Sequence, residues 1–208
     1  MHPGRLIWIA VALISWSPVA FATIVDGQVT GGKSLQLGGK FIKLTIPFAG
    51  SSPYNTVGAD TFNDSNLYGF DEDQNIEIRD PLTLDIMADG KGGGRKGGVV
   101  PVGITVASHY IFFDPGKLQK QQGEIQFDSM IIGVITKRNN LKNSDHLANT
   151  GVNYLNPGAR GLEQVDKVAI TGLQTISVNW IASSPGDYIR VITSYSPGAG
   201  VLIPSNQR

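Results

Sequence analysis

Short segments in which apolar and polar residues alternate recur along the chain, and clusters of turn-forming residues separate them. In residues 41–48, for example, Ile42, Leu44 and Ile46 lie two positions apart. Because successive side chains of a strand point to opposite faces, this period predicts half-buried β-strands. The 26 glycines of the 208 residues argue against a helical protein, since glycine costs about 1 kcal/mol inside a helix. We therefore expect an all-β fold.

The remaining alternating segments divide the chain into strands of ordinary length. They cover residues 75–78, 82–87, 104–113, 123–136, 176–182 and 188–193. The segments at 104–113 and 123–136 are expected to pair as one hairpin, with a bulge in the second strand near Asp128. The last two segments are expected to pair as another, with Trp180 facing the core. Short strands with Gly/Pro turns predict a single β-sandwich, jelly-roll-like or, alternatively, immunoglobulin-like.

Two stretches between the strands carry weaker signals. Residues 89–98 hold no large apolar side chain and are expected to form a mobile surface loop. The three basic residues of this stretch suit either an anion or the solvent. Further on, Ser144 is expected to cap a short helix that runs through Ala148.

The first 22 residues have the parts of a secretory signal peptide. Arg5 supplies a positive start, an apolar run covers residues 6–16, and a small-x-small end closes at Ala22. The apolar run is shorter than the about 20 residues that a membrane-spanning helix needs. We predict cleavage after Ala22, followed by a β-sandwich domain over residues 23–196 and a frayed tail over residues 197–208.

Charge and cysteine content narrow the partners and the chemistry. Removal of the predicted signal leaves 16 basic and 17 acidic residues, a net charge of −1, without the basic excess of a nucleic-acid binder. The chain contains no cysteine, which removes thiolate metal sites and cysteine nucleophiles. We expect no nucleic acid among the partners and no transmembrane segment after signal cleavage.

Four stretches of the chain resemble exported bacterial proteins of the exosortase-sorted (PEP-CTERM) group. They read NLYGFDE at 66–72, VASHYIFFDP at 106–115, YLNPGARGLE at 154–163 and SSPGDYIRV at 183–191. The resemblance spans roughly residues 60–195 and implies a secreted or extracellular protein without a defined activity, with the periplasm as the alternative address. Residues 194–208 lack the sorting tail of that group, which favours release from the inner membrane.

No residue pattern predicts a catalytic site. Ser108 and His109 are neighbours in a predicted strand, so their side chains point to opposite faces, and there is no Gly-x-Ser-x-Gly turn. Residues 144–146, Ser-Asp-His, look like a helix cap. A glycosidase needs two facing carboxylates, and the sequence alone does not place the acidic residues at 71–73 beside Asp114 or Glu124.

The polar stretches at 63–66 and 71–75 suggest a metal site. They concentrate the oxygen ligands that calcium prefers, and we predict Asn63, Asp64, Asp71 and Asp73 as its ligands. The spacing does not follow the 12-residue loop of an EF-hand. The competing interpretation is a set of polar turns in which Asn and Asp bond their own backbone.

Aromatic residues in expected loops suggest a carbohydrate site. Tyr54, Tyr68 and Tyr154 are predicted to bind a ligand by stacking on sugar rings, although a tyrosine at the end of a loop also packs as an ordinary lid. We expect a non-enzymatic envelope or extracellular-matrix protein that binds polysaccharide or surface proteins. A polysaccharide-acting glycoside hydrolase or lyase and a self-assembling structural subunit are the alternatives.

Overall fold

The computed structural model of the protein describes residues 23–156 and 158–195, so the predicted signal peptide and the predicted tail lie outside the described residues. Of the described residues, 46% are in strands and 8% in helices, which confirms the all-β prediction. In chain order the elements are β1 (Ile24–Gly31), α1 (Gly32–Gln36), β2 (Phe41–Lys43), β3 (Thr56–Val57), β4 (Leu67–Asp71), β5 (Ile76–Glu77), β6 (Leu82–Ala88), β7 (Gly94–Val100), β8 (Thr105–Phe113), β9 (Gln119–Phe127), β10 (Ile131–Ile135), α2 (Arg138–Asn143), the 3₁₀-helix η1 (Asp145–Leu147), β11 (Asn153–Tyr154), β12 (Lys167–Ile170), β13 (Thr175–Ala182) and β14 (Asp187–Ser194).

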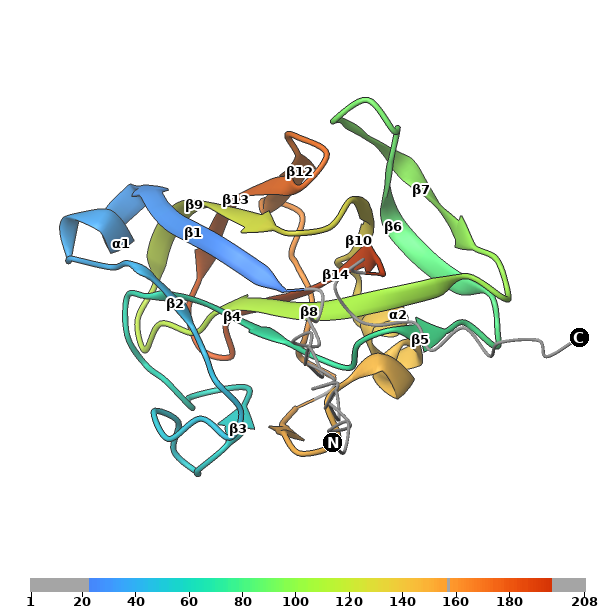
Figure 1. Ribbon diagram of the computed structural model, residues 1–208. Coiled ribbons are helices and arrows are strands. Elements are labelled where there is room, and N and C mark those ends of the chain that lie inside the picture. Colours follow the sequence, from blue (N-terminus) through green and yellow to red (C-terminus); the bar gives the residue numbers. More distant parts are fainter. Residues whose placement is uncertain (1–22, 157, 196–208) are drawn as a thin grey trace, which may run out of the picture.

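Two sheets face each other and form the sandwich (Figure 1). The smaller sheet has the order β1-β9-β13-β12, and the larger has the order β2-β4-β8-β14-β10-β6-β7, with β5 paired to β8. The core between them takes Ile24 and Trp180 from the smaller sheet and Phe113 and Ile189 from the larger. The rings of Phe113 and Trp180 stack across the gap with 6.4 Å between centroids. The strand order does not by itself distinguish a jelly-roll-like from an immunoglobulin-like sandwich.

Strands that follow one another in the chain often belong to different sheets, and both predicted hairpins are therefore wrong. β8 lies in the larger sheet and β9 in the smaller, and the same change separates β13 from β14. The predicted single strand over 123–136 is likewise two strands, β9 and β10, which occupy different sheets. Alternation identifies the buried face of a strand but not the neighbouring strand, because long-range packing decides the pairing.

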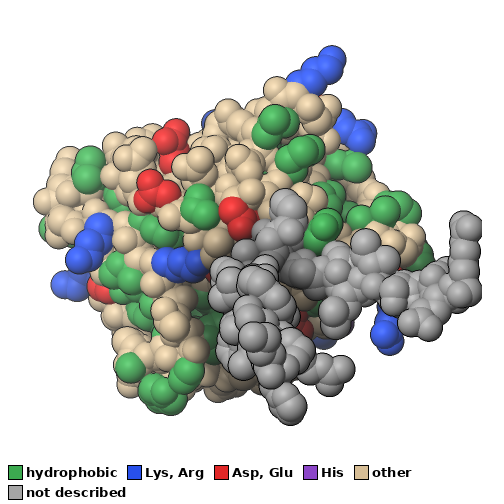
Figure 2. All heavy atoms as spheres, in the orientation of Figure 1, with side chains coloured by type: hydrophobic (Ala, Val, Ile, Leu, Met, Phe, Trp, Pro, Cys, Tyr) green, Lys and Arg blue, Asp and Glu red, His purple; other side chains and the backbone are tan. Residues whose placement is uncertain are grey.

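The glycine-rich stretch at 89–98 is not a loop throughout, which corrects the prediction. Residues 94–98 belong to β7, which pairs antiparallel with β6 in a hairpin that stands out from the sandwich (Figure 1). A Cβ atom at Gly97 would collide with the backbone of Leu84 and Asp85, so glycine allows this close pairing. Figure 2 shows basic side chains at the far end of this hairpin.

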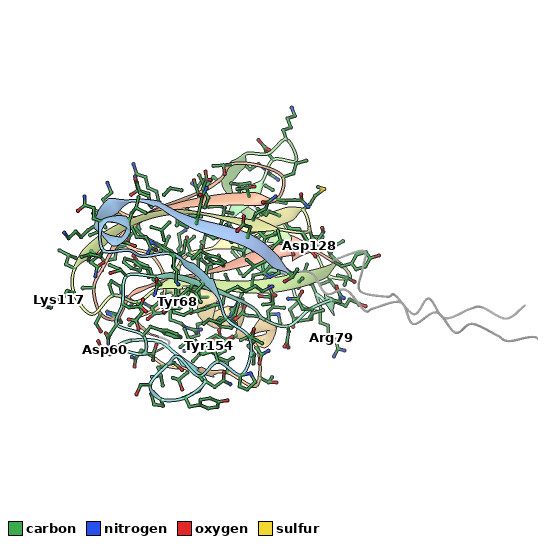
Figure 3. The ribbon with its side chains drawn as sticks, turned by 60° about the vertical axis from the view of Figure 1, so that its left-hand side comes forward. Asp60, Tyr68, Arg79, Lys117, Asp128 and Tyr154 are labelled. Atoms are coloured by element: carbon green, nitrogen blue, oxygen red, sulfur yellow. The ribbon has the colours of Figure 1, made fainter. Side chains whose placement is uncertain are left out.

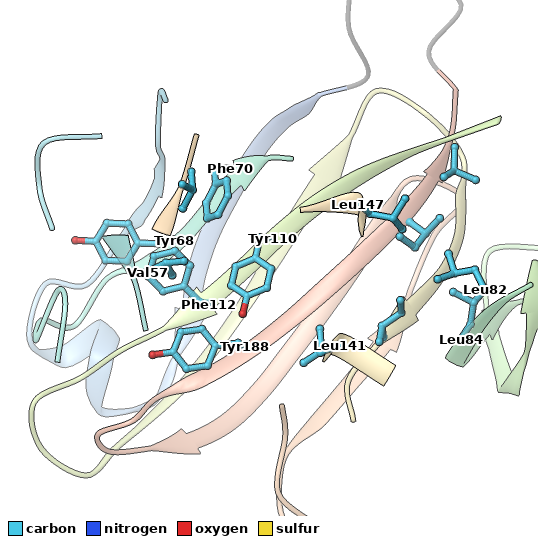
Figure 4. Close-up of a cluster of buried hydrophobic side chains, with 14 of the residues drawn as sticks. Val57, Tyr68, Phe70, Leu82, Leu84, Tyr110, Phe112, Leu141, Leu147 and Tyr188 are labelled. Atoms are coloured by element: carbon cyan, nitrogen blue, oxygen red, sulfur yellow. The ribbon is translucent and has the colours of Figure 1, made fainter. Parts of the chain in front are cut away.

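The outer face of the larger sheet is also buried, under a second apolar cluster (Figure 4). Tyr68, Phe112 and Tyr188 form a row of rings on this face, with centroids 5.2 and 5.9 Å apart. The segment between β2 and β4 covers the row at one end, while Leu141 of α2 and Leu147 of η1 cover it at the other. Residues 106–113 of β8 are consequently buried on both faces. The ion pair of Glu72 and Arg190 lies on this covered outer face.

The helical segment differs from its prediction at the cap. The predicted helix from Ser144 to Ala148 is replaced by α2 and η1, with Ser144 between them. The Ser144 hydroxyl makes no capping bond and donates instead to the carbonyl of Leu141, at 2.9 Å. Within residues 23–156 and 158–195, no helix has the length and apolarity required to cross a membrane.

Candidate functional site

Of the three predicted sugar-stacking tyrosines, Tyr68 is buried, which contradicts the prediction for it, and Tyr154 is partly buried against the outer apolar cluster (Figure 3). Tyr68 is 5% exposed, and its hydroxyl donates to Asp64 Oδ2 at 2.5 Å. The Tyr154 ring packs edge-on against Tyr110, and its hydroxyl donates to Glu72 Oε1 at 2.8 Å. Burial raises the pKa of both hydroxyls. Tyr54, which is 62% exposed, is the remaining candidate for stacking.

The four predicted calcium ligands are not brought together. Asn63 donates its side-chain amide to the Asp60 carbonyl, and Asp64 accepts from the backbone and side chain of Asn66. Asp71, the last residue of β4, takes part in a separate network. Asp73 follows the end of β4, and its pKa is raised by burial and by the charge of Glu72. Among the residues that the structure describes, no three His, Asp or Glu side chains lie close enough to hold a metal ion. The calcium site stays a prediction, without a geometry that gathers its ligands.

A fully buried ion pair occupies the outer face of the larger sheet. The guanidinium of Arg190 on β14 contacts Glu72 twice, with Nε–Oε2 at 2.6 Å and Nη2–Oε1 at 2.8 Å. The hydroxyls of Ser108 and Tyr154 also donate to the Glu72 carboxylate, at 2.6 and 2.8 Å. Burial alone would lower the pKa of Arg190, but the charge and hydrogen bonds of Glu72 raise it above its usual value. Both side chains are inaccessible to solvent, so the pair organises the core rather than binding a ligand.

The same arginine holds the helical segment onto the sheet. Its Nη1 donates to the Leu141 carbonyl at 3.0 Å and to the Ser144 hydroxyl at 2.6 Å. Its guanidinium carbon lies 5.6 Å from the ring centroid of Tyr110. These contacts connect β14 to α2 and to the turn that follows α2. The helical segment in turn carries Arg138, one wall of the pocket described below.

A second network has the order of a nucleophile, a base and an orienting carboxylate. His109 lies between the Asp71 carboxylate, with Nδ1–Oδ1 at 2.8 Å, and the Thr193 hydroxyl, with Nε2–Oγ1 at 3.0 Å. Catalytic triads have this order of groups. However, His109 and Thr193 are both 0% exposed, so a substrate has no access to the hydroxyl. We assign the network a structural role.

The Asp71 carboxylate accepts from the backbone N–H of Ile24 at 3.0 Å and pairs with Lys43 at 2.8 Å. Burial alone would raise the pKa of Asp71, but the hydrogen bond and charge of His109, together with Lys43, lower it to about 2. Because folding lowers the pKa of Asp71, its ionised carboxylate stabilises the fold at pH values above the unfolded pKa of about 3.9. This stability is lost as the pH falls through the folded pKa of about 2.

Replacement of Asp71 is therefore expected to weaken the fold at neutral pH. Asp71→Asn should reduce the free energy of unfolding by about 2 kcal/mol at pH 7, with a difference from wild type that shrinks below pH 4. Thermal unfolding between pH 2 and 7 measures this, with Asp80→Asn as an exposed control. A loss that is equally large at pH 2 and pH 7 contradicts the electrostatic explanation.

A small polar pocket of about 230 Å³, which we call the Asp187 pocket, is lined by both acidic and basic side chains. It forms where the connection between β13 and β14 faces the loop that follows β11. Its walls are Leu118, Arg138, residues 159–163 and residues 181–187. Asp187, the first residue of β14, is 4% exposed, and its Oδ2 has no hydrogen-bond partner in the described chain. A buried carboxyl oxygen without a donor costs free energy, which marks this side chain as unusual.

The protonation of Asp187 follows from this position. Burial, and then the charges of Asp166 and Glu163, raise its pKa to about 8. The side chain is therefore mostly protonated at pH 7, and its carboxyl group can donate one hydrogen bond and accept others. Carboxyl groups that stay protonated at neutral pH are found in binding and catalytic sites, where they meet a ligand or transfer a proton.

The loop on the other side of the pocket is held by specific backbone contacts. Gly161 has a φ of 111°, and a Cβ at this position would collide with the backbone of Thr136 and Arg138. Asp166 accepts from the backbone N–H groups of Glu163 and Ile181, both at 2.9 Å, and so ties the loop to β13. Glycine is required at 161 because only it combines this φ with this approach.

Two arginines complete the polar lining. Arg160 is 4% exposed and makes a two-pronged contact with Asp145, at 2.9 and 2.5 Å. Burial alone would lower its pKa, but the hydrogen bonds and charge of Asp145 raise it. Arg138, the first residue of α2, is exposed at the rim. The pocket therefore presents a protonated acid, the guanidinium of Arg138, the carboxylate of Glu163, and the hydroxyls of Ser183 and Ser184.

The sequence did not single out Asp187 as a site residue. Its neighbours at 183–186 read as an ordinary turn, and turns rich in Ser, Pro and Gly are common. The one available signal was an acidic residue followed by an apolar strand, because this strand carries Asp187 into the interior. Nothing local in the chain indicates that residues 159–163 close over it.

The fold and the pocket define the molecule as an all-β sandwich with a small polar pocket beside its β13–β14 connection. Comparison of the chain with protein-family models, with curated proteins and with solved structures gives no match. The pocket is therefore the basis for a function.

Proposed function

We propose that the protein is an exported component of the cell envelope or extracellular matrix that binds one sugar unit of a polysaccharide in the Asp187 pocket. The observation that carries the proposal is the buried carboxyl of Asp187, whose Oδ2 lacks a partner in the described chain and which lines a cavity of donors and acceptors. A sugar ring presents neighbouring hydroxyls that both donate and accept, which matches this lining. The signal-like N-terminus and the resemblance to exosortase-sorted proteins support export.

The dimensions of the pocket support a small ligand unit. Its volume of about 230 Å³ lies below the range of roughly 300–1,000 Å³ that drug-sized ligands occupy. Arg138 at the rim suits an acidic sugar, whose carboxylate would accept from the guanidinium. Tyr54, Tyr68 and Tyr154, the three tyrosines predicted from the sequence to bind a ligand, do not line this pocket.

Binding is tested by isothermal titration of the protein with neutral and acidic mono- and oligosaccharides, with and without Ca²⁺. At least one saccharide is expected to bind. Asp187→Leu has a similar shape but no hydrogen-bonding group, and it is expected to weaken binding about tenfold, the loss for one hydrogen bond of about 1.4 kcal/mol. Glu77→Gln, an exposed carboxylate outside the pocket, serves as the matched control. The proposal fails if no saccharide binds, or if Asp187→Leu and Arg138→Ala leave the affinity unchanged.

A glycoside hydrolase is the second candidate, because Asp187 and Glu163 line the same pocket. Glycosidases use a protonated carboxylic acid that protonates the leaving oxygen and a second carboxylate that acts as base or nucleophile. The raised pKa of Asp187 suits the acid. Release of reducing ends from polysaccharides would then decline as the pH rises through about 8, and Asp187→Asn would slow it at least about 100-fold. Binding without any release of reducing ends favours the first candidate.

A further inference from the structure

The first two described residues, Thr23 and Ile24, are held by two carboxylates. The backbone nitrogen of Thr23 donates to Asp128 Oδ1 at 3.0 Å, and the Asp128 N–H donates back to the Thr23 carbonyl at 3.0 Å. The Thr23 hydroxyl donates to Asp71 Oδ2 at 2.7 Å, and the Ile24 N–H donates to Asp71 Oδ1 at 3.0 Å. Figure 3 shows Asp128 beside the start of β1.

These contacts fix Thr23 at the edge of the core. Ile24 is 1% exposed and belongs to the cluster between the two sheets. The Asp128 hydrogen bonds continue the β1–β9 ladder by one residue, since Ile24 is paired with Phe127. The Thr23 nitrogen therefore has a defined position with a carboxylate oxygen at hydrogen-bond distance, whatever precedes it in the chain.

The bond that joins Ala22 to Thr23 is the one where we predict signal cleavage. Hydrolysis of this bond adds water, leaves a carboxylate on Ala22, and turns the Thr23 nitrogen into a primary amine that takes up a proton. We propose that Asp128 is the binding site for this new α-ammonium group. Processing after Ala22 then adds an ion pair, the Thr23–Asp128 ion pair, that stabilises the packing of β1 against the sandwich. This inference rests on the export part of the proposed function, and not on saccharide binding.

The charged groups around Thr23 determine how the stability added by the Thr23–Asp128 ion pair depends on pH. The charged or titratable groups that face Thr23 are Asp128, Asp71, Lys43, which pairs with Asp71 at 2.8 Å, and His109, which bonds Asp71 from the other side. Lys43 pairs with Asp71 and also donates to the Thr23 hydroxyl. Asp128 Oδ1 accepts from the Thr23 nitrogen and from the Ser129 hydroxyl. A charge-assisted bond of this kind is stronger than the neutral amide bond that it replaces.

An α-amino group has a pKa of about 7.7–8.0 when unperturbed, and pairing with a carboxylate raises it in the folded state. A group whose folded pKa is raised stabilises the fold fully below its unfolded pKa. This stability is lost as the pH rises through the folded pKa. The Thr23–Asp128 ion pair is therefore expected to stabilise the fold at about pH 6 to 7 and not at about pH 10.

The cleavage site is tested first. The full 208-residue chain is expressed in a bacterium with its own export machinery, and the exported protein is sequenced from its N-terminus. Thr23 is the expected first residue. Any other first residue overturns the proposal.

The Thr23–Asp128 ion pair is tested by comparing a chain that begins at Thr23 with a chain that retains residues 20–22 in front of it. At about pH 6.5 the chain that begins at Thr23 is expected to unfold about 2–4 °C higher, and the two should converge near pH 10. Groups common to both chains, such as His109 and Lys43, cancel in this difference. Asp128→Asn is expected to abolish the difference, whereas Asp26→Asn, an exposed carboxylate on β1, is expected to preserve it.

Equal unfolding temperatures at every pH overturn the proposal, as does a difference that Asp128→Asn leaves unchanged. Should Asp128→Asn fail to fold, the α-amine of the wild-type chain is titrated by NMR instead. A pKa of the α-amine above about 8.0 in the folded protein supports the Thr23–Asp128 ion pair, and a value at or below the unperturbed range overturns it. A protein that binds no saccharide but begins at Thr23 and shows the shift disproves the proposed binding and retains this inference.

Discussion

Arg190→Met is expected to destabilise the protein by about 3–5 kcal/mol, because it leaves the Glu72 carboxylate buried without its cation. Glu72 and Arg190 have side chains that are 0% exposed, and they contact each other at 2.6 and 2.8 Å. The loss also releases the Leu141 carbonyl and the Ser144 hydroxyl from Arg190, which loosens α2 against the sheet. Denaturant unfolding at pH 7 measures the change, with the slope checked for two-state behaviour.

The double variant Glu72→Gln/Arg190→Met separates the buried charge from the packing. The amide introduced by Glu72→Gln is uncharged. Its oxygen can accept from one of the two hydroxyls of Ser108 and Tyr154 and its nitrogen can donate to the other, so most of the lost stability is expected to return. Lys137→Met is the matched control, since Lys137 is 76% exposed and lies 3.4 Å from Asp85; its loss is expected to stay below about 1 kcal/mol. An equal loss in the single and double variants would mean that shape, and not charge, makes Arg190 important.

Asp187→Asn is expected to stabilise the protein at neutral pH. The pKa of Asp187 is about 8 in the folded protein, so folding favours the protonated carboxyl. Below the unfolded pKa of about 3.9 the side chain is protonated in both states and does not oppose folding. As the pH rises from there to 8, the unfolded side chain is ionised and folding must add a proton, which costs increasingly more free energy. The neutral amide removes this dependence. At pH 7 the gain is expected to reach up to about 4 kcal/mol, or on the order of 10 °C in unfolding temperature.

The measurement is a pair of stability curves from about pH 4 to about pH 8.5, for wild type and Asp187→Asn. The curves should meet near pH 4 and separate steadily above it, while Glu77→Gln should follow wild type throughout. A gain in stability from Asp187→Asn, combined with weaker saccharide binding by Asp187→Leu, would identify Asp187 as a residue kept for function at a cost in stability. Parallel curves would show that Asp187 titrates normally in the fold, and the proposed binding site would lose its main support.

The contrast between the two acidic residues Asp71 and Asp187 explains why the sequence did not reveal the site. Both border apolar strand segments, and the chain gives no local sign that separates them. In the fold, Asp71 meets His109 and Lys43, whereas Asp187 meets a cavity and two further carboxylates. These partners come from distant parts of the chain, so the pKa of Asp71 falls to about 2 while that of Asp187 rises to about 8.

The positions of Tyr68 and Tyr154 escaped sequence analysis for a related reason. Tyr68 and Tyr154 lie in segments that read as loop or strand end, where an aromatic ring is as often a lid as a binding face. The second apolar layer on the outer face of the larger sheet covers Tyr68, and the Glu72 network takes the Tyr154 hydroxyl. Sequence alternation predicts one buried face per strand and cannot reveal that a sheet is covered on both sides.

What the sequence by itself determined is the all-β class, the burial of Trp180 and the opposite directions of Ser108 and His109, since these follow from the two-residue period of a strand. Only the tertiary structure decided which strands pair, because β8 and β9, or β13 and β14, cross between sheets where a local turn pattern predicts a hairpin. It alone also placed Asp187 in its pocket and Asp128 beside Thr23. Local pattern governs which face of a strand is apolar, whereas contacts between residues far apart in the chain govern partners, cavities and pKa values.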